Sequence, residues 1–165
     1  MAAEQSEPLA VLREPGTALL LRHALAPGVG DPPGFELDDC STQRNLSDAG
    51  RAQARALGER LRALGVSSAR VYSSRWCRCL ETARLLDLGP VQALPALDSF
   101  FQQRSIAPSR TRAAREFLHA LPPGPPVILV THQVNISALT GRFTDSGAGV
   151  LVRPSAAGEV EVLEE

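Results

Sequence analysis

One short apolar run, Thr17-Ala18-Leu19-Leu20-Leu21, ends directly in the basic pair Arg22-His23. Its length and its Gly16 and Pro/Gly-rich borders predict a buried strand. In open α/β sheets, ligands bind outside the carboxyl ends of the strands, which is where this pair would lie. An imidazole can act as a nucleophile, and a guanidinium offers a planar fork of donors to an oxyanion such as phosphate. We therefore expect His23 and Arg22 to mark a ligand site.

A second apolar run, Val127-Ile128-Leu129-Val130, ends in Thr131-His132 and partly repeats this pattern. Between the two runs, helical and strand patterns alternate, which predicts an α/β fold: a mostly parallel central sheet with helices on both faces. The carboxyl ends of two parallel strands can meet at one crevice of such a sheet. We therefore expect His23 and His132 to be neighbours.

The whole pattern predicts a single domain over residues 1–165, with residues 1–16 as a tail or an edge segment. Residues 24–46 are rich in Pro and Gly, and we expect an active-site loop there because the segment follows His23 directly. Ser47 can cap the next helix. The expected helices cover residues 47–64, 76–88, 109–120 and 135–140. The expected strands cover residues 17–22, 66–73, 91–94, 127–130, 150–153 and 159–163, and the last two alternate as a C-terminal hairpin.

Composition narrows the possible partners. Of the 165 residues, 44% are hydrophobic and 21% are charged, and the net charge of -1 gives no reason to expect a nucleic-acid or membrane partner. No apolar run is long enough to span a bilayer. Residues 1–5 lack the basic and apolar regions of a signal peptide, so we expect a soluble, cytoplasmic protein, or a periplasmic one if this is a mature exported chain with a new initiator Met.

The three cysteines, Cys40, Cys77 and Cys79, are too few for a disulfide framework. Cys77 and Cys79 lie two positions apart on an expected helix, so their side chains diverge and cannot easily face one metal ion. This spacing favours structural thiols. A disulfide between Cys40 and one of the other two is the alternative in an oxidising compartment.

Four motifs in this order resemble the histidine phosphatase superfamily, which has the phosphoglycerate-mutase-like fold. The first is the strand that ends in Arg22-His23, and the last is the strand that ends in His132. Between them stand Leu46-Ser47-Asp48-Ala49-Gly50-Arg51-Ala52-Gln53-Ala54 and Ser74-Arg75-Trp76-Cys77-Arg78-Cys79-Leu80-Glu81-Thr82-Ala83. The length of the chain is similar to that of the short, minimal bacterial phosphatases of this superfamily.

The resemblance implies a role for each matched residue. His23 would be the nucleophile that takes the phosphoryl group, while Arg22, Arg78 and His132 would surround the phosphate. Two arginines and a second histidine can stabilise the charge that develops on phosphoryl oxygens, so no metal and no cofactor is expected. His23 must attack as a neutral imidazole, so its other ring nitrogen should donate to a backbone carbonyl or a carboxylate.

The chain departs from the family at the general acid. The family places a Glu a few residues after the second helix, but Ser99 occupies the matching position here. Asp98 is the nearest carboxylate and is our tentative acid. His132, Asp38 and Asp39 are alternatives. A weak acid favours substrates with acidic leaving groups.

Arg44 and Asn45 precede the helix that Ser47 caps, and helix N-termini attract anions. We expect these two residues either to touch the substrate or to anchor the loop. The favoured function is a metal-independent phosphomonoester hydrolase of the histidine acid phosphatase type, acting on a phosphorylated small molecule or a phosphoprotein. The alternatives are a phosphotransferase or mutase and a non-catalytic module that binds phosphate or phosphopeptides.

Overall fold

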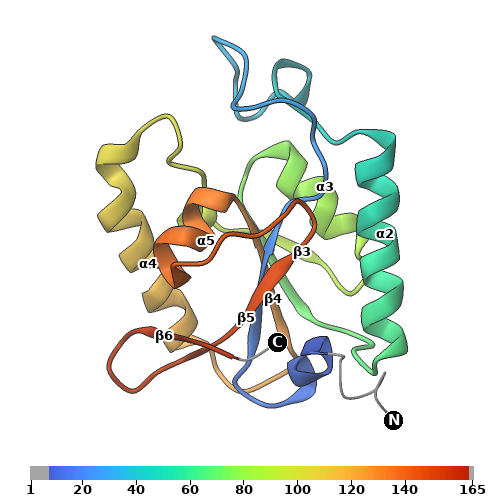
Figure 1. Cartoon of the computed structure of the whole chain (residues 1–165), viewed down its shortest axis with the longest axis vertical. Coiled ribbons are helices and arrows are strands. Elements are labelled where there is room, and N and C mark those ends of the chain that lie inside the picture. Colours follow the sequence, from blue (N-terminus) through green and yellow to red (C-terminus); the bar gives the residue numbers. More distant parts are fainter. Residues whose placement is uncertain (1–7, 164–165) are drawn as a thin grey trace.

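The computed structural model describes residues 8–163 and contains one six-stranded sheet with the strand order β3-β2-β4-β1-β5-β6 (Figure 1). The strands β3, β2, β4 and β1 run parallel to one another. β5 is antiparallel to β1, and β5 and β6 form an antiparallel hairpin at that side of the sheet. The strand bounds are Ala18–Arg22 for β1, Arg70–Ser73 for β2, Val91–Ala93 for β3, Val127–Thr131 for β4, Gly149–Pro154 for β5 and Val160–Val162 for β6.

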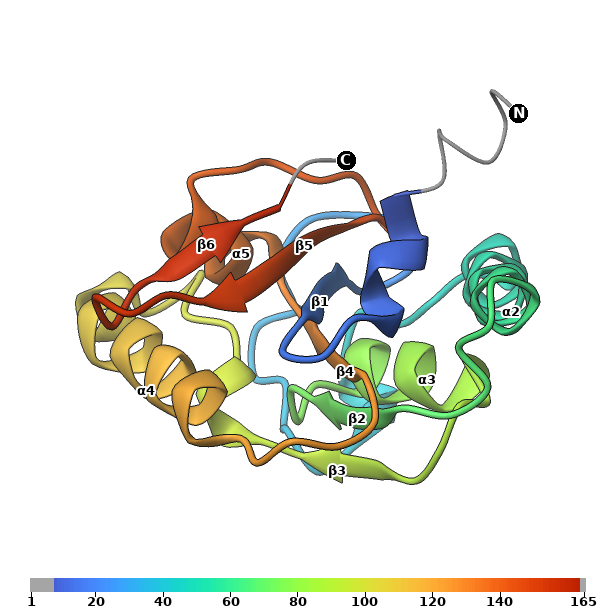
Figure 2. The same cartoon turned by 90° about the horizontal axis from the view of Figure 1, so that it is seen from below.

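Helices cover both faces of this sheet, as the view from below makes clear (Figure 2). Side chains alternate along β1, so Leu19 and Leu21 enter one apolar core while Leu20 enters the other. The first core lies under α2 and α3, and the second lies under α4 and α5. The helix bounds are Asp48–Ala63 for α2, Cys77–Leu85 for α3, Ala107–Ala120 for α4 and Gln133–Thr140 for α5.

Two glycines allow α2 to pack closely on its neighbours. A Cβ atom on Gly50 would lie 2.1 Å from the carbonyl oxygen of Leu25, and one on Gly58 would lie 2.1 Å from that of Leu86. Ser47 caps the same helix by accepting a hydrogen bond from the Gly50 N–H at 3.1 Å. The start of α2 is therefore fixed against the chain that leaves β1.

The predicted fold class is confirmed, including the mostly parallel sheet, the helices on both faces and the C-terminal hairpin. The region predicted as a tail or an edge segment contains the 3₁₀ helix η1 (Pro8–Arg13), whose Leu12 is fully buried. Leu12 belongs to the core because removing an apolar side chain from water is favourable in free energy. Residues 1–7 of the same prediction lie outside the described part.

The topology brings the two histidine-bearing strand ends together. β1 and β4 are adjacent, with Arg22 paired to Thr131, and the His23 N–H donates to the Thr131 carbonyl at 3.1 Å. β2 lies on the other side of β4, so the segment after Ser73 reaches the same edge. Within residues 8–163, no helix combines the length and the apolar character needed to cross a bilayer.

Candidate active site

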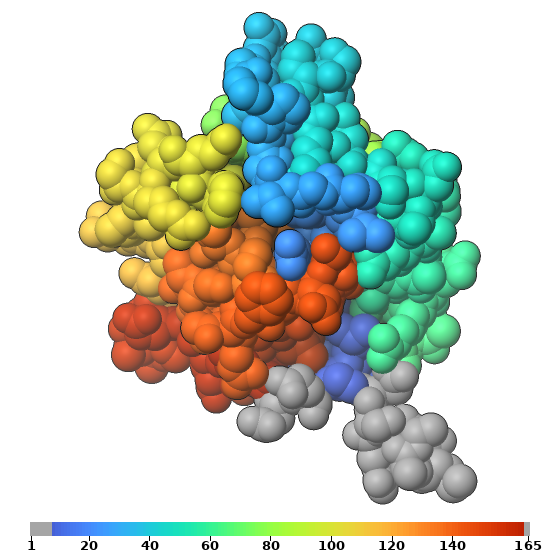
Figure 3. Space-filling view, turned by 45° about the horizontal axis from the view of Figure 1, so that its top comes forward, coloured from blue at the N-terminus to red at the C-terminus, as the bar shows by residue number. Residues whose placement is uncertain are grey.

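A cavity of about 330 Å³ opens at the carboxyl ends of β1 and β4. Figure 3 looks onto this face, where the blue and cyan loop after β1, the yellow segment before α4 and the orange segment around α5 meet. The cavity is lined by Arg22, His23, Gly28, Val29, Gly30, Asp31, Arg44, Arg78, Ser99, Phe101, Gln102, Arg104, His132, Gln133 and Val134.

His23 is held as a neutral imidazole whose unprotonated nitrogen lies beside Arg78. Its Nδ1 lies 2.8 Å from the carbonyl oxygen of Ala24, which can only accept a hydrogen bond, so Nδ1 carries the proton. Nε2 then has a lone pair, and it accepts a hydrogen bond from the Arg78 Nε at 3.2 Å. This backbone carbonyl is the acceptor that the sequence could not identify.

The surroundings of His23 keep it uncharged. The side chain is 3% exposed, and burial lowers its pKa to about 3, with further lowering by the nearby charges of Arg78, Arg44 and Arg22. Burial disfavours the charged form of an imidazole because a low-dielectric interior solvates charge poorly. At neutral pH the ring is therefore a base and a potential nucleophile.

Motif residues outside the cavity fix the backbone that presents His23. The hydroxyl of Thr82 accepts the Ala24 N–H at 3.0 Å, and the amide oxygen of Gln53 accepts the Leu25 N–H at 3.0 Å. Gln53 also donates to the Ser146 carbonyl at 2.8 Å, which ties the loop before β5 to the start of the active-site loop. Thr82 and Gln53, which belong to two of the sequence motifs, therefore position the backbone next to His23.

Arg78 is anchored by a buried carboxylate. Its Nη1 donates to Asp31 Oδ1 at 2.9 Å, and both side chains are nearly inaccessible, with 4% and 3% exposed. Asp31 also accepts the indole N–H of Trp76 at 2.9 Å and the Arg44 backbone N–H at 3.2 Å. Burial alone would raise the pKa of Asp31, but the hydrogen bonds and charge of Arg78 outweigh it and lower that pKa.

Two further arginines, Arg22 and Arg44, line the cavity. Arg22 donates from Nη1 to the Thr144 carbonyl at 2.9 Å, while its Nε is buried and has no hydrogen-bond partner. Arg44 donates from Nε to the Gly30 carbonyl at 2.6 Å and from Nη1 to the carbonyl of Ala26. A buried donor without a partner is costly, and a bound oxyanion would satisfy that of Arg22.

His132 lies beside His23, with 5.7 Å between the ring centroids. Its Nε2 shares a hydrogen bond of 2.8 Å with the Ser74 hydroxyl, and the Cys79 sulfur lies 3.5 Å from the same nitrogen. Burial lowers the pKa of His132 well below its ordinary value, and the charge that His23 could carry lowers it further. Trp76 packs against the ring with its centroid 5.3 Å away.

Asp98 does not reach the cavity, which argues against the acid role expected for it. Its carboxylate is 2% exposed and accepts hydrogen bonds from the Arg75 backbone N–H at 2.9 Å and from Arg75 Nε at 2.7 Å. Asp98 therefore anchors the segment that carries Arg75 and Trp76. Its neighbour Ser99 lines the cavity instead. Adjacent residues point in different directions, and the sequence alone did not resolve which one faces the site.

The other carboxylates proposed as acids also lie outside the cavity lining. Asp39 caps the 3₁₀ helix η2 (Cys40–Thr42) by accepting the Ser41 N–H at 3.1 Å, and Asp38 is exposed. Of the alternatives, His132 is the one that lines the cavity. The carboxylate that does line it is Asp31, which the sequence analysis missed because a Pro/Gly-rich loop has no periodicity to orient its side chains.

Arg44 and Asn45 have separate locations. Arg44 lines the cavity, as its substrate-binding interpretation requires. Asn45 donates to the carbonyls of Cys40 at 2.8 Å and Gln43 at 3.1 Å, which is the loop-anchoring alternative.

A disulfide joins Cys40 to Cys77, with 5.7 Å between their Cα atoms, while Cys79 is free and buried. The favoured expectation of free thiols is thus wrong for two of the three cysteines. The bridge ties the active-site loop to the residue before Arg78. Burial raises the pKa of Cys79 to about 12, so this thiol is neutral.

The cavity thus brings together a buried neutral imidazole, a second histidine and several guanidinium groups, in accord with the family that the sequence motifs resemble. The sequence profile of the histidine phosphatase superfamily (branch 1) matches residues 18–100, half of the chain. The chain therefore belongs to the histidine phosphatase superfamily. No curated protein sequence matches it significantly.

Solved structures share this fold at low sequence identity. A mycobacterial glucosyl-3-phosphoglycerate phosphatase is 21% identical with a TM-score of 0.64, over 89% of this chain and 96% of that one. A protein assigned as the phosphohistidine phosphatase SixA of Agrobacterium tumefaciens is 16% identical with a TM-score of 0.62, over 92% and 97%. YhfR of Bacillus stearothermophilus is 18% identical with a TM-score of 0.64, over 90% and 96%.

Proposed function

We propose that the protein is a phosphomonoester hydrolase that works through a phosphohistidine intermediate on His23, without a metal ion. The observation that carries this proposal is the tautomer of His23. Its Nδ1 proton is committed to the Ala24 carbonyl, and Nε2 is directed to Arg78 in a cavity lined by four arginines. A neutral nucleophile surrounded by donors is what attack on a phosphate dianion requires.

The reaction then has two balanced steps. The lone pair of His23 Nε2 forms a bond to phosphorus while the ester P–O bond breaks, and the leaving oxygen takes that electron pair. Water next attacks phosphorus, the P–N bond breaks, and Nε2 recovers its lone pair as inorganic phosphate forms. Arg22, Arg44 and Arg78 supply the hydrogen bonds that stabilise the charge on the equatorial oxygens.

The leaving group receives little help from the protein. Asp31 is the carboxylate in the cavity lining, and its lowered pKa and its pairing with Arg78 make it a poor acid. His132 is neutral, and its Nε2 is already engaged with Ser74. We infer that good substrates carry leaving groups that depart without protonation, such as aryl or acyl oxygens or a protonated nitrogen.

The missing carboxylic acid also supports a second candidate, a module that binds phosphate or phosphopeptides without turnover. A phosphotransferase or mutase has no such observation in its favour. Turnover separates the two candidates, because both predict binding of a phosphorylated ligand.

The test measures phosphate release from 4-nitrophenyl phosphate in excess chelator, for the parent and for His23→Asn. We expect the parent to be active and resistant to chelator, and the variant to be inactive while its melting temperature stays close to that of the parent. A variant with parental activity would overturn the proposed nucleophile. A folded parent that binds vanadate but releases no phosphate from any activated ester would favour the binding module.

A further inference from the structure

The rim of the cavity is unusually apolar for a site that holds so many cations. Four large apolar side chains are exposed among residues 8–163, namely Leu25 at 41%, Val29 at 85%, Phe101 at 41% and Phe143 at 76%. Val29 and Phe101 line the cavity, and the Phe143 ring centroid lies 6.0 Å from the Arg22 guanidinium carbon. Three of the four therefore gather around one opening, and grouped exposed apolar residues commonly mark a binding surface.

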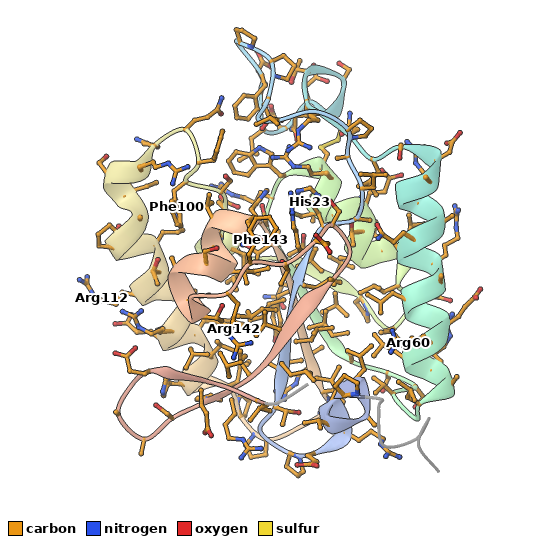
Figure 4. All side chains as sticks on the ribbon, in the orientation of Figure 1. His23, Arg60, Phe100, Arg112, Arg142 and Phe143 are labelled. Carbon is orange, nitrogen blue, oxygen red and sulfur yellow. A yellow bond between two sulfur atoms is a disulfide. The ribbon has the colours of Figure 1, made fainter. Side chains whose placement is uncertain are left out.

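Figure 4 labels Phe143 and His23, and the Phe143 ring lies against the guanidinium of Arg22, the residue that precedes His23. Phe101 belongs to the segment before α4. Its ring lies next to Gly30, because a Cβ atom on that glycine would be 3.7 Å from the ring. The Arg104 guanidinium lies 5.2 Å above the Phe101 ring. The rim thus has an aromatic side chain on each of two separate elements.

Val29 is held at this opening by the residues that follow it. The carbonyl of Gly30 accepts a hydrogen bond from Arg44, and the carboxylate of Asp31 is paired with Arg78. These contacts fix the backbone on the C-terminal side of Val29, so the residue is carried at a defined place beside the cavity.

We propose that Val29, Phe101 and Phe143 are specificity-determining residues that select phosphomonoesters with an apolar, ring-sized leaving group. The inference rests on the proposed function. The deep part of the cavity is cationic and takes the phosphoryl group, and its volume of about 330 Å³ exceeds what that group fills. The ester substituent would then extend outward against the rim. Burying apolar surface there is favourable, so an apolar substituent would bind better than a polar one.

The test compares phenyl phosphate with 2-naphthyl phosphate, because their leaving groups have similar acidity and differ mainly in apolar area. We expect kcat/KM of the parent to favour the naphthyl ester by roughly three- to tenfold, from the area that a second ring would bury. Val29→Ser, Phe101→Ser and Phe143→Ser, singly and combined, should reduce this ratio toward one. Leu25→Ser is the matched control for Phe101→Ser: it removes an apolar side chain that is as exposed as Phe101 but lies outside the cavity lining, and it should keep the parental ratio.

Inhibition by inorganic phosphate separates a rim effect from damage to the cationic part of the site. We expect the inhibition constant for phosphate to stay within about twofold in the rim variants. A parental ratio near one, or rim variants that weaken inorganic phosphate as much as the naphthyl ester, would overturn the inference. If the parent hydrolyses neither these two esters nor 4-nitrophenyl phosphate, the proposed function fails. The affinities for phenyl phosphate and 2-naphthyl phosphate are then compared by calorimetry. Equal affinities would overturn the rim inference separately.

Discussion

The ends of β1 and β4 look alike in sequence but differ in chemistry. Each is an apolar strand that ends in a histidine, both rings are buried, and burial lowers both pKa values. The Nε2 of His23 contacts a guanidinium, whereas the Nε2 of His132 contacts the Ser74 hydroxyl and lies near the Cys79 sulfur. Under the proposed function, Nε2 of His23 attacks phosphorus, while Nε2 of His132 stays hydrogen-bonded to Ser74. Because both rings are buried, the partners of the ring nitrogens, rather than burial, distinguish the two histidines.

The largest effect should come from removing the nucleophile. His23→Asn should lower kcat/KM for activated aryl phosphates by roughly 10⁴-fold or more, because a covalent step cannot proceed without the attacking nitrogen. Phosphate release measured under single-turnover conditions checks this. Residual activity within a hundredfold of the parent would mean that the comparison assigns the nucleophile to the wrong strand end.

His132→Asn should have a smaller effect, a loss of roughly 10²-fold in kcat, because the His132 ring packs beside His23 and helps to position it but takes no part in the covalent step. The measurement is steady-state kinetics on the same aryl ester. If the two histidine variants proved equally inactive and both failed to form a phosphoenzyme, the distinction between the strand ends would be lost.

A variant of Asp31 tests whether His23 at the end of β1 depends on the ion pair that anchors Arg78. Asp31→Ala should lower kcat by roughly ten- to a hundredfold, because Arg78 would lose its anchor and its alignment with His23 Nε2. Trp76→Phe is the control, since it removes one donor to Asp31 but leaves the ion pair, and it should cost only a few-fold. Comparable losses in both variants would show that Asp31 acts through packing. Recovery of activity in Asp31→Glu would support the charged anchor.

The smallest effect concerns stability. The folded pKa of His23 is about 3, below its ordinary 6.5, so the unfolded chain binds more protons between these values. The contribution of His23 to the free energy of unfolding is complete above pH 6.5 and is lost as the pH falls toward 3, with a slope of at most about 1.4 kcal/mol per pH unit. The free energy of unfolding is measured by urea titration between pH 6.5 and 4.5. It should fall less steeply with decreasing pH in His23→Gln than in the parent. Parallel slopes would contradict the buried, neutral state of His23.

Much of the cavity could be predicted because its residues follow regular elements. The apolar runs fix β1 and β4, their pairing brings His23 and His132 together, and a helical repeat places Arg78 on α3. The contents of the loop could not be predicted in the same way. No periodicity orients Asp31, and only the folded loop brings it to Arg78.

Two further features also required the structure. The sequence offered Asp98 as an acid, but its neighbour faces the cavity and Asp98 pairs with Arg75. The choice between Cys77 and Cys79 as the partner of Cys40 depends on which face of α3 meets the loop. In these two cases a step of one or two residues along the chain changes the direction of a side chain, a difference that composition does not contain.

The most direct test of the central claim is to trap the phosphoenzyme. The parent is mixed with a radiolabelled aryl phosphate, quenched in alkali within its first turnover, digested and mapped by mass spectrometry. We predict one phosphoryl group on His23, bonded through Nε2, stable in alkali and labile in acid, with His132→Asn still labelled and His23→Asn unlabelled. Label on His132 or on another residue, or full turnover with no label on His23, would contradict the account.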